Sequence, residues 1–343
     1  MRFVTKTTLL FSVFFLFNPA LTFATQDYDY NYGPERAATT QQPKPNVDSL
    51  DGSFVYEYPL TLPPGRSGME PGLSLTYSSK STEQISPFGY GWSLNIPYIE
   101  RENKNGLNKI YATTTNLFSS FDGELRATTT ATTTEFAALS ENGGFRKYEY
   151  VNQSYWRVTD KTGTQYTFGT TSSSQIVNNA SSTQVFRWML EEIRDRNGNY
   201  VKYEYQKDSN QIYPYKITYT GNGTTDGIYQ VEFLRENRTD IATSSRAGFA
   251  VVSKQRIKEI AVRENNNFLK SYQLSYGTGD NGYRSLLTSL QEAGRSEAGA
   301  TTTMPAMRMG YSIPTEGWTS NGSWTMPAYF VDDTGSTPSE GDM

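Results

Sequence analysis

Histidine and cysteine are both missing from this chain of 343 residues. Their absence excludes Ser-His-Asp and Cys-His catalysis, and it excludes zinc sites that use His or Cys ligands. Any acid–base chemistry would have to rest on Asp, Glu, Lys or Tyr. No disulfide can form either, so we expect the stability of the fold to come from a large core.

Hydrophobic residues are scarce and helix signals almost absent, whereas aromatic residues are abundant. Hydrophobic residues make up 36% of the chain, yet aromatic residues reach 14% and include 25 tyrosines. This balance favours strands over helices and argues against disorder. The formal net charge of −4 gives no sign of a polyanionic partner, so we expect no nucleic-acid binding.

Residues 1–24 have the pattern of a secretory signal peptide. Arg2 and Lys6 supply positive charge, and the apolar run at residues 9–17 is too short to span a bilayer. We expect cleavage after Ala24, with an uncleaved N-terminal anchor as the alternative. No later segment has the length of a membrane-spanning helix. The sequence therefore predicts a secreted bacterial protein without stable membrane insertion.

Two polar segments flank a central region with strand patterning. Residues 25–49 lack apolar periodicity and contain Pro34, Pro43 and Pro45, so we expect a flexible lead-in before order begins at Phe54. Residues 50–315 carry the strand pattern. Residues 316–343 lose it again, and we interpret them as a linker toward a further region.

Alternating apolar and polar residues predict an all-β domain, a large antiparallel sheet of successive hairpins. Asn-Gly and Gly-Gly pairs between the alternating runs suit tight hairpin turns. Residues 285–293 are the single candidate for a helix. The i, i+2 pattern recurs at Tyr148/Tyr150, Tyr166/Phe168, Phe186/Trp188/Leu190, Val201/Tyr203/Tyr205, Ile217/Tyr219, Tyr229/Val231/Phe233 and Tyr272/Leu274/Tyr276.

Two neighbouring stretches form the most specific pattern of the chain. They are YPLTLPPGRSGMEPGLSLTYSS at residues 58–79 and FGYGWSLNIPYIER at residues 88–101. Both combine an alternating strand with Gly/Pro turn chemistry. Together they resemble the opening of the SpvB domain, which is shared by Salmonella-type virulence plasmid B proteins, B components of insecticidal Tc toxins and bacterial RHS/YD-repeat proteins.

The resemblance implies a non-catalytic wall segment of an RHS/Tc-toxin-like β shell around a toxin cargo. Its implied partners are a downstream FG-GAP/RHS region of the same polypeptide and that cargo, with no cofactor and no metal. Within the two stretches, turn-forming or core residues stand out, and the resemblance implies structural roles for them. They are Pro63, Pro64, Gly65, Arg66, Gly68, Pro71, Gly89, Gly91, Trp92 and Arg101. We expect Trp92 to anchor the core and Arg101 to pair with a carboxylate or with backbone carbonyls.

A weak internal repeat, D-x-x-G-x-x-Φ-x-Φ, starts at Asp160 and again at Asp195. It resembles a YD/RHS repeat, and two similar hairpins are the alternative interpretation. Two copies are too few for a solenoid. Asp195 also opens a faint calcium-loop pattern, but Gln206 stands where an EF-hand needs a bidentate Glu.

Two further functions remain open from the sequence. Abundant Tyr and Trp would suit a secreted carbohydrate- or surface-binding module, if those rings were exposed and not core. An ADP-ribosyltransferase would use a Glu-x-Glu pair, and Glu100-Arg101-Glu102 is the one example in the chain. Because that pair ends a strand, we expect it to be a solvated strand end and the protein not to be an enzyme.

Overall fold

The computed structural model describes residues 45–47, 49, 52–81, 86–112, 117–128, 134–279, 284–296 and 299–311. All of them lie in one compact unit, residues 43–343. The expected signal peptide and the linker at residues 316–343 lie outside the described residues. Within these ranges nearly all regular structure is antiparallel β, so the predicted all-β fold class is confirmed. The short 3-10 helices are η2 (Leu107–Lys109) and η3 (Ser172–Ser174).

A small antiparallel sheet contains the first motif stretch. Its order is β1-β2-β3-β4, with β1 at Asn46–Val47, β2 at Phe54–Pro59, β3 at Ser74–Ser78 and β4 at Trp92–Leu94. Because β1 pairs with β2, strand pairing begins inside the segment that we expected to be a flexible lead-in.

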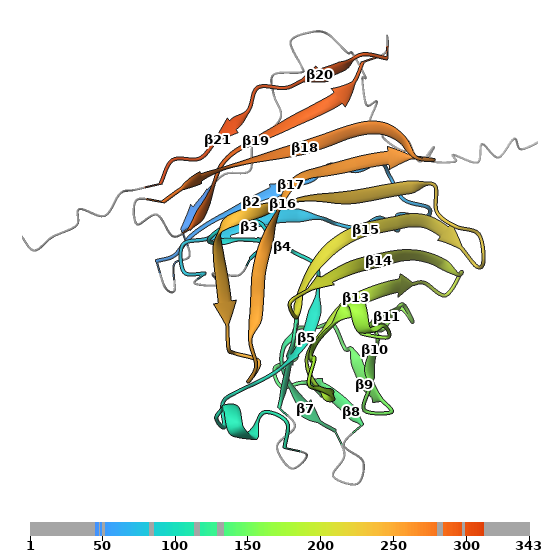
Figure 1. The fold of residues 1–343 in the computed structure, drawn as a ribbon. Coiled ribbons are helices and arrows are strands. Elements are labelled where there is room, and N and C mark those ends of the chain that lie inside the picture. Colours follow the sequence, from blue (N-terminus) through green and yellow to red (C-terminus); the bar gives the residue numbers. More distant parts are fainter. Residues whose placement is uncertain are drawn as a thin grey trace, which may run out of the picture. The chain divides into compact units, whose positions relative to one another are not determined.

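Eight strands close on themselves into a ring, which forms the lower part of Figure 1. Seven neighbouring pairings run from β5 through β6, β7, β8, β9, β10 and β11 to β13. Residues 187–189 of β13 then pair with β5, which closes the ring. The bounds are β5 Tyr98–Arg101, β6 Phe118–Ser120, β7 Gly123–Ala127, β8 Glu135–Ala138, β9 Lys147–Val151, β10 Tyr155–Thr159, β11 Gln165–Phe168 and β13 Ser181–Arg194. The short β12 (Gln175–Asn178) pairs with β13.

From β13 the sheet continues as a second, open sheet of long hairpins. Each strand from β14 to β19 pairs antiparallel with the next, and the short β20 and β21 both pair with β19. The bounds are β14 Asn199–Asp208, β15 Gln211–Asn222, β16 Tyr229–Ser244, β17 Val251–Glu264, β18 Asn267–Thr278, β19 Ser285–Arg295, β20 Thr301–Thr303 and β21 Met307–Arg308.

The prediction of a helix at residues 285–293 is wrong, because these residues belong to strand β19. They pair with β18 from Ser285 opposite Thr278 to Ala293 opposite Ser271. A register shift at Ser275 and Tyr276 breaks the strict alternation. Leu287 and Leu290 therefore both point into the core, three residues apart as they would be on a helix face.

The interior of the ring is filled with aromatic side chains. Trp156 is stacked on Tyr150 at 4.6 Å between centroids and meets Phe118 at 4.8 Å. Trp188 packs edge-on against Tyr150 at 5.5 Å. A ring of eight strands is just wide enough for side chains to fill. Most aromatic side chains of the ring strands are therefore core.

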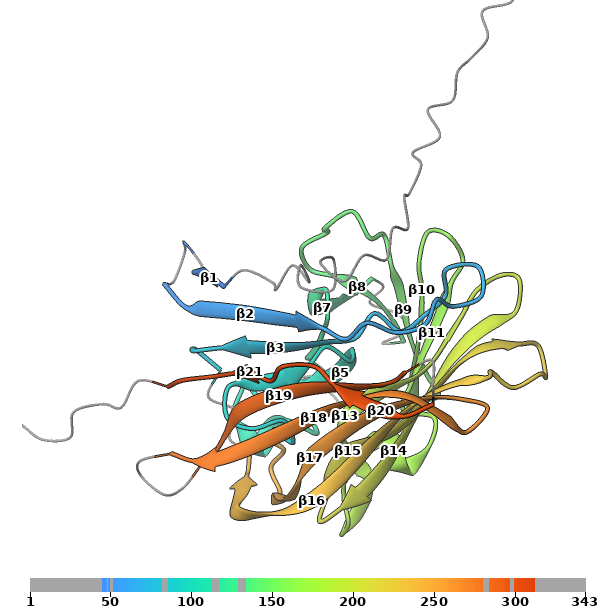
Figure 2. The same ribbon diagram turned by 90° about the horizontal axis from the view of Figure 1, so that it is seen from above.

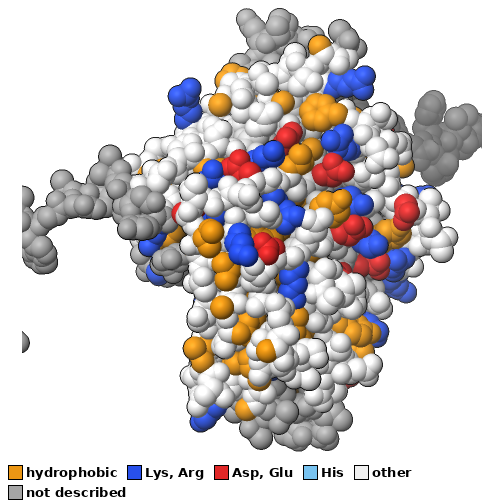
Figure 3. All heavy atoms as spheres, in the orientation of Figure 1, with side chains coloured by type: hydrophobic (Ala, Val, Ile, Leu, Met, Phe, Trp, Pro, Cys, Tyr) orange, Lys and Arg blue, Asp and Glu red, His pale blue; other side chains and the backbone are white. Residues whose placement is uncertain are grey.

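The small sheet lies on one face of the open sheet, as Figure 2 shows from above. Tyr58 of β2 meets Tyr272 of β18 edge-on at 6.3 Å, and Leu75 and Ile260 are buried in the same core. On the side seen in Figure 3, acidic and basic side chains alternate over the open sheet. The open sheet also contains cross-strand ion pairs such as Glu232–Arg263 at 2.6 Å.

The two copies of the D-x-x-G pattern form the same hairpin turn. The carboxylate of Asp160 accepts hydrogen bonds from the N–H groups of Thr162 and Thr164. The carboxylate of Asp195 accepts them from Asn197 and Asn199. Gly163 and Gly198 share a φ of 83°, which favours glycine. The carboxylate of each aspartate is thus hydrogen-bonded to backbone N–H groups of its own turn.

Candidate functional site

The loop between β2 and β3 carries the first group of motif residues and makes a sharp reversal. Ser67 and Gly68 have φ values of 55° and 75°, and Met69 donates its N–H to the carbonyl of Arg66 at 3.1 Å. Two consecutive positive φ values define a type I′ turn. A side chain at Gly65 would place Cβ 2.1 Å from the carbonyl oxygen of Met69, so this turn requires glycine there.

Tyrosines from the open sheet hold this loop in place. The hydroxyl of Tyr272 donates to the carbonyl of Thr61, and that of Tyr219 donates to the carbonyl of Pro63, both at 3.0 Å. Pro63 and Pro64 restrict the backbone between these points and the turn. Pro71 follows the turn, and its carbonyl accepts from Leu73 N–H at 2.9 Å. The loop therefore joins the two sheets and does not project freely.

The second motif stretch brings two glycines and a tryptophan against the same core. Gly91 has a φ of 78°, and a Cβ there would lie 2.5 Å from the ring of Tyr77. The missing side chain lets Tyr77 approach Trp92 at 5.4 Å between ring centroids. Trp92 is only 3% exposed and donates its Nε1–H to the hydroxyl of Tyr311 at 2.9 Å.

Gly89 has a similar role where the motif meets β19. Its φ is 95°, and a Cβ would lie 3.1 Å from the carbonyl oxygen of Ser285. That carbonyl accepts the N–H of Tyr90 at 2.8 Å. The small sheet is therefore fastened by backbone contact to a strand almost two hundred residues later.

Arg101 lies inside the ring among aromatic side chains. Its Nε donates to the carbonyl of Val185 at 2.9 Å. Its guanidinium lies 4.9 Å from the centroid of Phe118 and 5.5 Å from that of Trp188, within the range of cation–π attraction. Burial lowers the pKa of Arg101. The backbone carbonyl of Val185 is thus one partner of Arg101, as expected.

Glu100 is not the solvated strand end that we expected. Its carboxylate accepts from Arg187 Nε at 3.0 Å and Nη2 at 2.7 Å, and Arg246 approaches the other oxygen at 3.3 Å. Glu100 is buried, whereas Glu102 is half-buried. Arg187 and Arg246 come from β13 and from the turn between β16 and β17, which the sequence alone could not bring together.

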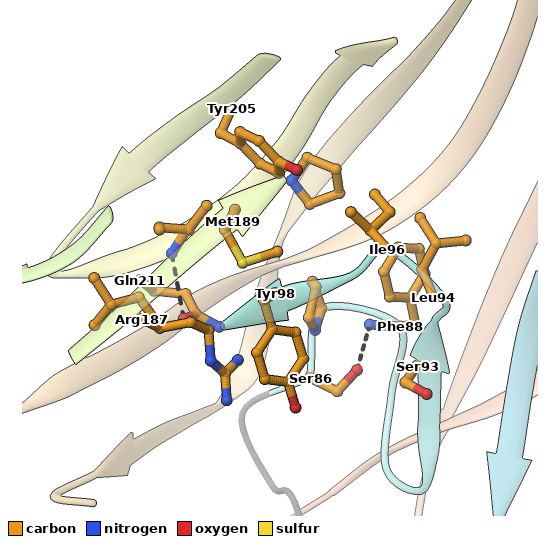
Figure 4. Close-up of a pocket in the computed structure, with 14 residues that line it drawn as sticks. Ser86, Phe88, Ser93, Leu94, Ile96, Tyr98, Arg187, Met189, Tyr205 and Gln211 are labelled. Atoms are coloured by element: carbon orange, nitrogen blue, oxygen red, sulfur yellow. Dashed lines mark hydrogen bonds between the residues drawn. The ribbon is translucent and has the colours of Figure 1, made fainter. Parts of the chain in front are cut away.

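A pocket of about 110 Å³ lies beside this ion pair, between the small sheet, β13 and the turn from β14 to β15. Figure 4 shows Tyr98 and Arg187 on one side and Leu94, Ile96 and Phe88 on another. The guanidinium of Arg187 lies 4.0 Å from the centroid of Tyr98. The described lining is mainly apolar and holds no nucleophile–base pair.

The sequence analysis did not identify a second ion pair, which is buried. Arg238 donates from Nε and Nη2 to Asp240 at 2.9 and 2.8 Å, and its Nη1 reaches the carbonyl of Ser86 at 3.2 Å. The pair lies in a bulge of β16, where the register against β17 shifts. In the sequence this pair appears as Arg-x-Asp within an alternating run, and that pattern is also typical of strands exposed to solvent. Only the bulge turns both side chains inward.

No group of three or more Asp, Glu, Cys or His residues that could hold a metal ion occurs in the described part of the chain. Among the same residues, no helix is long and apolar enough to cross a membrane.

The family model described as Salmonella virulence plasmid 65kDa B protein, SpvB, matches residues 48–149 and 141–226, together more than half of the chain. No curated protein sequence matches the chain.

Several solved structures share the fold. The crystal structure of TcdB2-TccC3 superposes with a TM-score of 0.65 at 18% identity, covering 78% of this chain and 16% of that one. The Tc holotoxin pore of Photorhabdus luminescens gives 0.64 at 19% identity, covering 76% and 16%. The N-terminal domain of effector protein SpvB from Salmonella typhimurium strain LT2 gives 0.60 at 16% identity, covering 70% and 99%. At these identities the likeness concerns the fold, and this chain spans about a sixth of the TcdB2-TccC3 chain.

Proposed function

Because the chain belongs to the SpvB family, whose model matches more than half of its residues, we propose that it is a non-catalytic wall segment of a secreted, toxin-type assembly. The observation that carries the proposal is the shared fold. The same architecture makes up 16% of the TcdB2-TccC3 chain and 99% of the solved SpvB N-terminal domain.

The construction of the domain suits a wall. The interior of the ring is packed with aromatic rings, and the small sheet is fastened to the open sheet through Tyr219, Tyr272 and Tyr90. These contacts stiffen a broad sheet. The one Glu-x-Glu pair supports the same proposal, because Glu100 is held by Arg187 and Arg246. A carboxylate occupied in this way is poorly placed to orient a substrate.

The proposed partners are a downstream FG-GAP/RHS region of the same polypeptide and a polypeptide cargo. The strand order supports this arrangement. One side of the sheet closes into the ring, whereas at the other side, among the described residues, β19 pairs with the short β20 and β21 along part of its length. An incompletely covered strand is where further strands can be added.

The test is to identify the native secreted product with an antibody against the purified domain, and to image it by electron microscopy. We expect a polypeptide much longer than 343 residues that forms hollow particles. A secreted product that ends at residue 343 and forms no particle would contradict the proposal, and glycan-array binding by that product would favour a binding module. NAD hydrolysis that is lost in both Glu100→Gln and Glu102→Gln would instead indicate an enzyme.

A further inference from the structure

The pocket of about 110 Å³ beside the Glu100–Arg187 ion pair has no role in the proposed wall function. It lies where three parts of the domain meet. Leu94 belongs to the small sheet, Met189 to the ring strand β13, and Ile212 to β15 of the open sheet. Of the described lining residues, only Ser93 is exposed. The pocket is therefore a preformed space at a junction within the core.

Apolar side chains from distant parts of the chain form most of the walls. Phe88, Leu94 and Ile96 line one side (Figure 4), and Ile176 and Ile212 come from β12 and β15. All of these except the half-buried Leu94 are buried. A charged ligand would lose its hydration in such a space without gaining an equivalent partner. The walls therefore favour a neutral, apolar ligand.

The polar side chains of the lining are already bound to other parts of the protein. Arg187 donates two hydrogen bonds to Glu100, and its guanidinium lies over the ring of Tyr98. The other polar lining residues have backbone partners, and they are Ser86, Ser93, Tyr205 and Gln211. Water is held in a buried space by several polar partners, whereas apolar cavities stay dry. An apolar molecule therefore suits this pocket better than water does.

The volume of the pocket limits the size of its ligand. An apolar cavity of about 150 Å³ lined by aliphatic and aromatic side chains binds benzene. The pocket here is smaller, at about 110 Å³, so it admits a molecule of about four to six carbon atoms. Met189 makes the fit adaptable, because its unbranched side chain can fill irregular gaps.

We propose that this pocket is a binding site for a small, neutral hydrocarbon of no more than about six carbon atoms. An empty apolar space costs stability in proportion to its volume, so a ligand that fills it stabilises the folded chain. Because the walls come from the small sheet, the ring and the open sheet, the bound molecule contacts all three. The inference is independent of the proposed wall function, since it uses only the pocket.

NMR of methionine methyl groups tests the proposal, because Met189 lines the pocket. The 8 methionines of the chain are labelled with ¹³C at the methyl group, and Met189→Leu assigns the signal of Met189. Benzene is then titrated into the folded protein. We expect the Met189 signal to shift and to saturate with a dissociation constant of about 1 mM or lower.

Two comparisons show whether this shift is specific. Met304 is 42% exposed and is not part of the lining, so its signal should stay unchanged. Pyrrolidinium, a charged ring of similar size, should shift neither signal, because the pocket offers a charge no compensation.

Two substitutions of Leu94 change the pocket in opposite directions. Leu94→Trp fills it and should weaken benzene binding by about tenfold or more. Leu94→Ala enlarges it and should bind ethylbenzene at least about fivefold more tightly than the parent chain does. Leu139→Trp is the matched control, because Leu139 is 53% exposed and lies outside the lining. This control should leave the benzene titration unchanged.

Circular dichroism verifies that each variant is folded. A Met189 shift that grows without saturating, or an equal shift with pyrrolidinium, would overturn the proposal. So would benzene binding of unchanged affinity in folded Leu94→Trp. If that variant does not fold, the ethylbenzene titration of Leu94→Ala decides, and no gain in affinity would count against the site.

Discussion

Trp92→Ala should cost about 3–5 kcal/mol of unfolding free energy, because a fully buried tryptophan leaves a large cavity when it is truncated. The ring is 3% exposed and packs against Tyr77 at 5.4 Å and Tyr56 at 6.2 Å. It lies where β3, β4 and the last described residues meet. The change therefore removes contacts between segments far apart in sequence.

Trp92→Phe separates the packing from the hydrogen bond. Phenylalanine keeps an aromatic ring next to Tyr77 but loses the Nε1–H that reaches Tyr311. Tyr311 still donates to the carbonyl of Leu287 at 2.8 Å. No buried donor is left unpaired by the change, so we expect a smaller loss of about 1–2 kcal/mol.

Urea unfolding followed by far-ultraviolet circular dichroism measures both variants without depending on tryptophan emission. Equal m-values would show that the change lies in stability and not in the extent of unfolding. A Trp92→Ala variant within about 1 kcal/mol of the parent chain would refute the argument, since a loss that small is incompatible with a closely packed tryptophan.

Three further predictions concern the motif, the ion pair and pH. Gly91→Ala should lower stability by more than about 1 kcal/mol, because φ is 78° and the new Cβ would meet Tyr77 at 2.5 Å; an unchanged melting temperature would contradict this. Glu100→Gln should cost about 3 kcal/mol, since it removes the buried carboxylate charge that accepts both hydrogen bonds from the mostly buried Arg187; a loss below about 1 kcal/mol in urea unfolding, the value typical of an exposed pair, would be evidence against it. Burial, with smaller contributions from nearby acidic groups, raises the pKa of Tyr58 to about 12 from 10.0. The folded state therefore binds more protons than the unfolded state above pH 10, and stability should fall as the pH rises from 10.0 to about 12. A Tyr58→Phe variant that loses as much stability as the parent chain between pH 10.0 and about 12 would argue against this coupling.

Local sequence patterns identified the strands because strand side chains alternate with a period of two. The runs at Tyr148, Phe186, Val201 and Tyr272 all lie in strands. The prediction of a helix at residues 285–293 was wrong because a bulge in β19, at Thr288, places two buried leucines of that strand three residues apart. A bulge depends on the partner strand, so a single run cannot reveal it.

Several hairpin turns lack the glycine signal that we used. Both central residues have positive φ at Asn152-Gln153, Ser209-Asn210 and Asn265-Asn266. This conformation belongs to type I′ turns, in which asparagine is tolerated as well as glycine. A search for asparagine pairs between alternating runs would have found at least Asn265-Asn266.

The sequence by itself determined the β class, most strands, the glycine-dependent turns of the two motif stretches and the family resemblance. All of these depend on neighbouring residues, through period-two alternation and the conformational freedom of glycine. The tertiary structure decided that β13 closes a ring through β5 and β11, and that Glu100 meets Arg187. It also decided which aromatic side chains became core. Those outcomes depend on strand register between distant segments, because one register brings Glu100 beside Arg187 and a shift of one residue would turn that side chain to the opposite face.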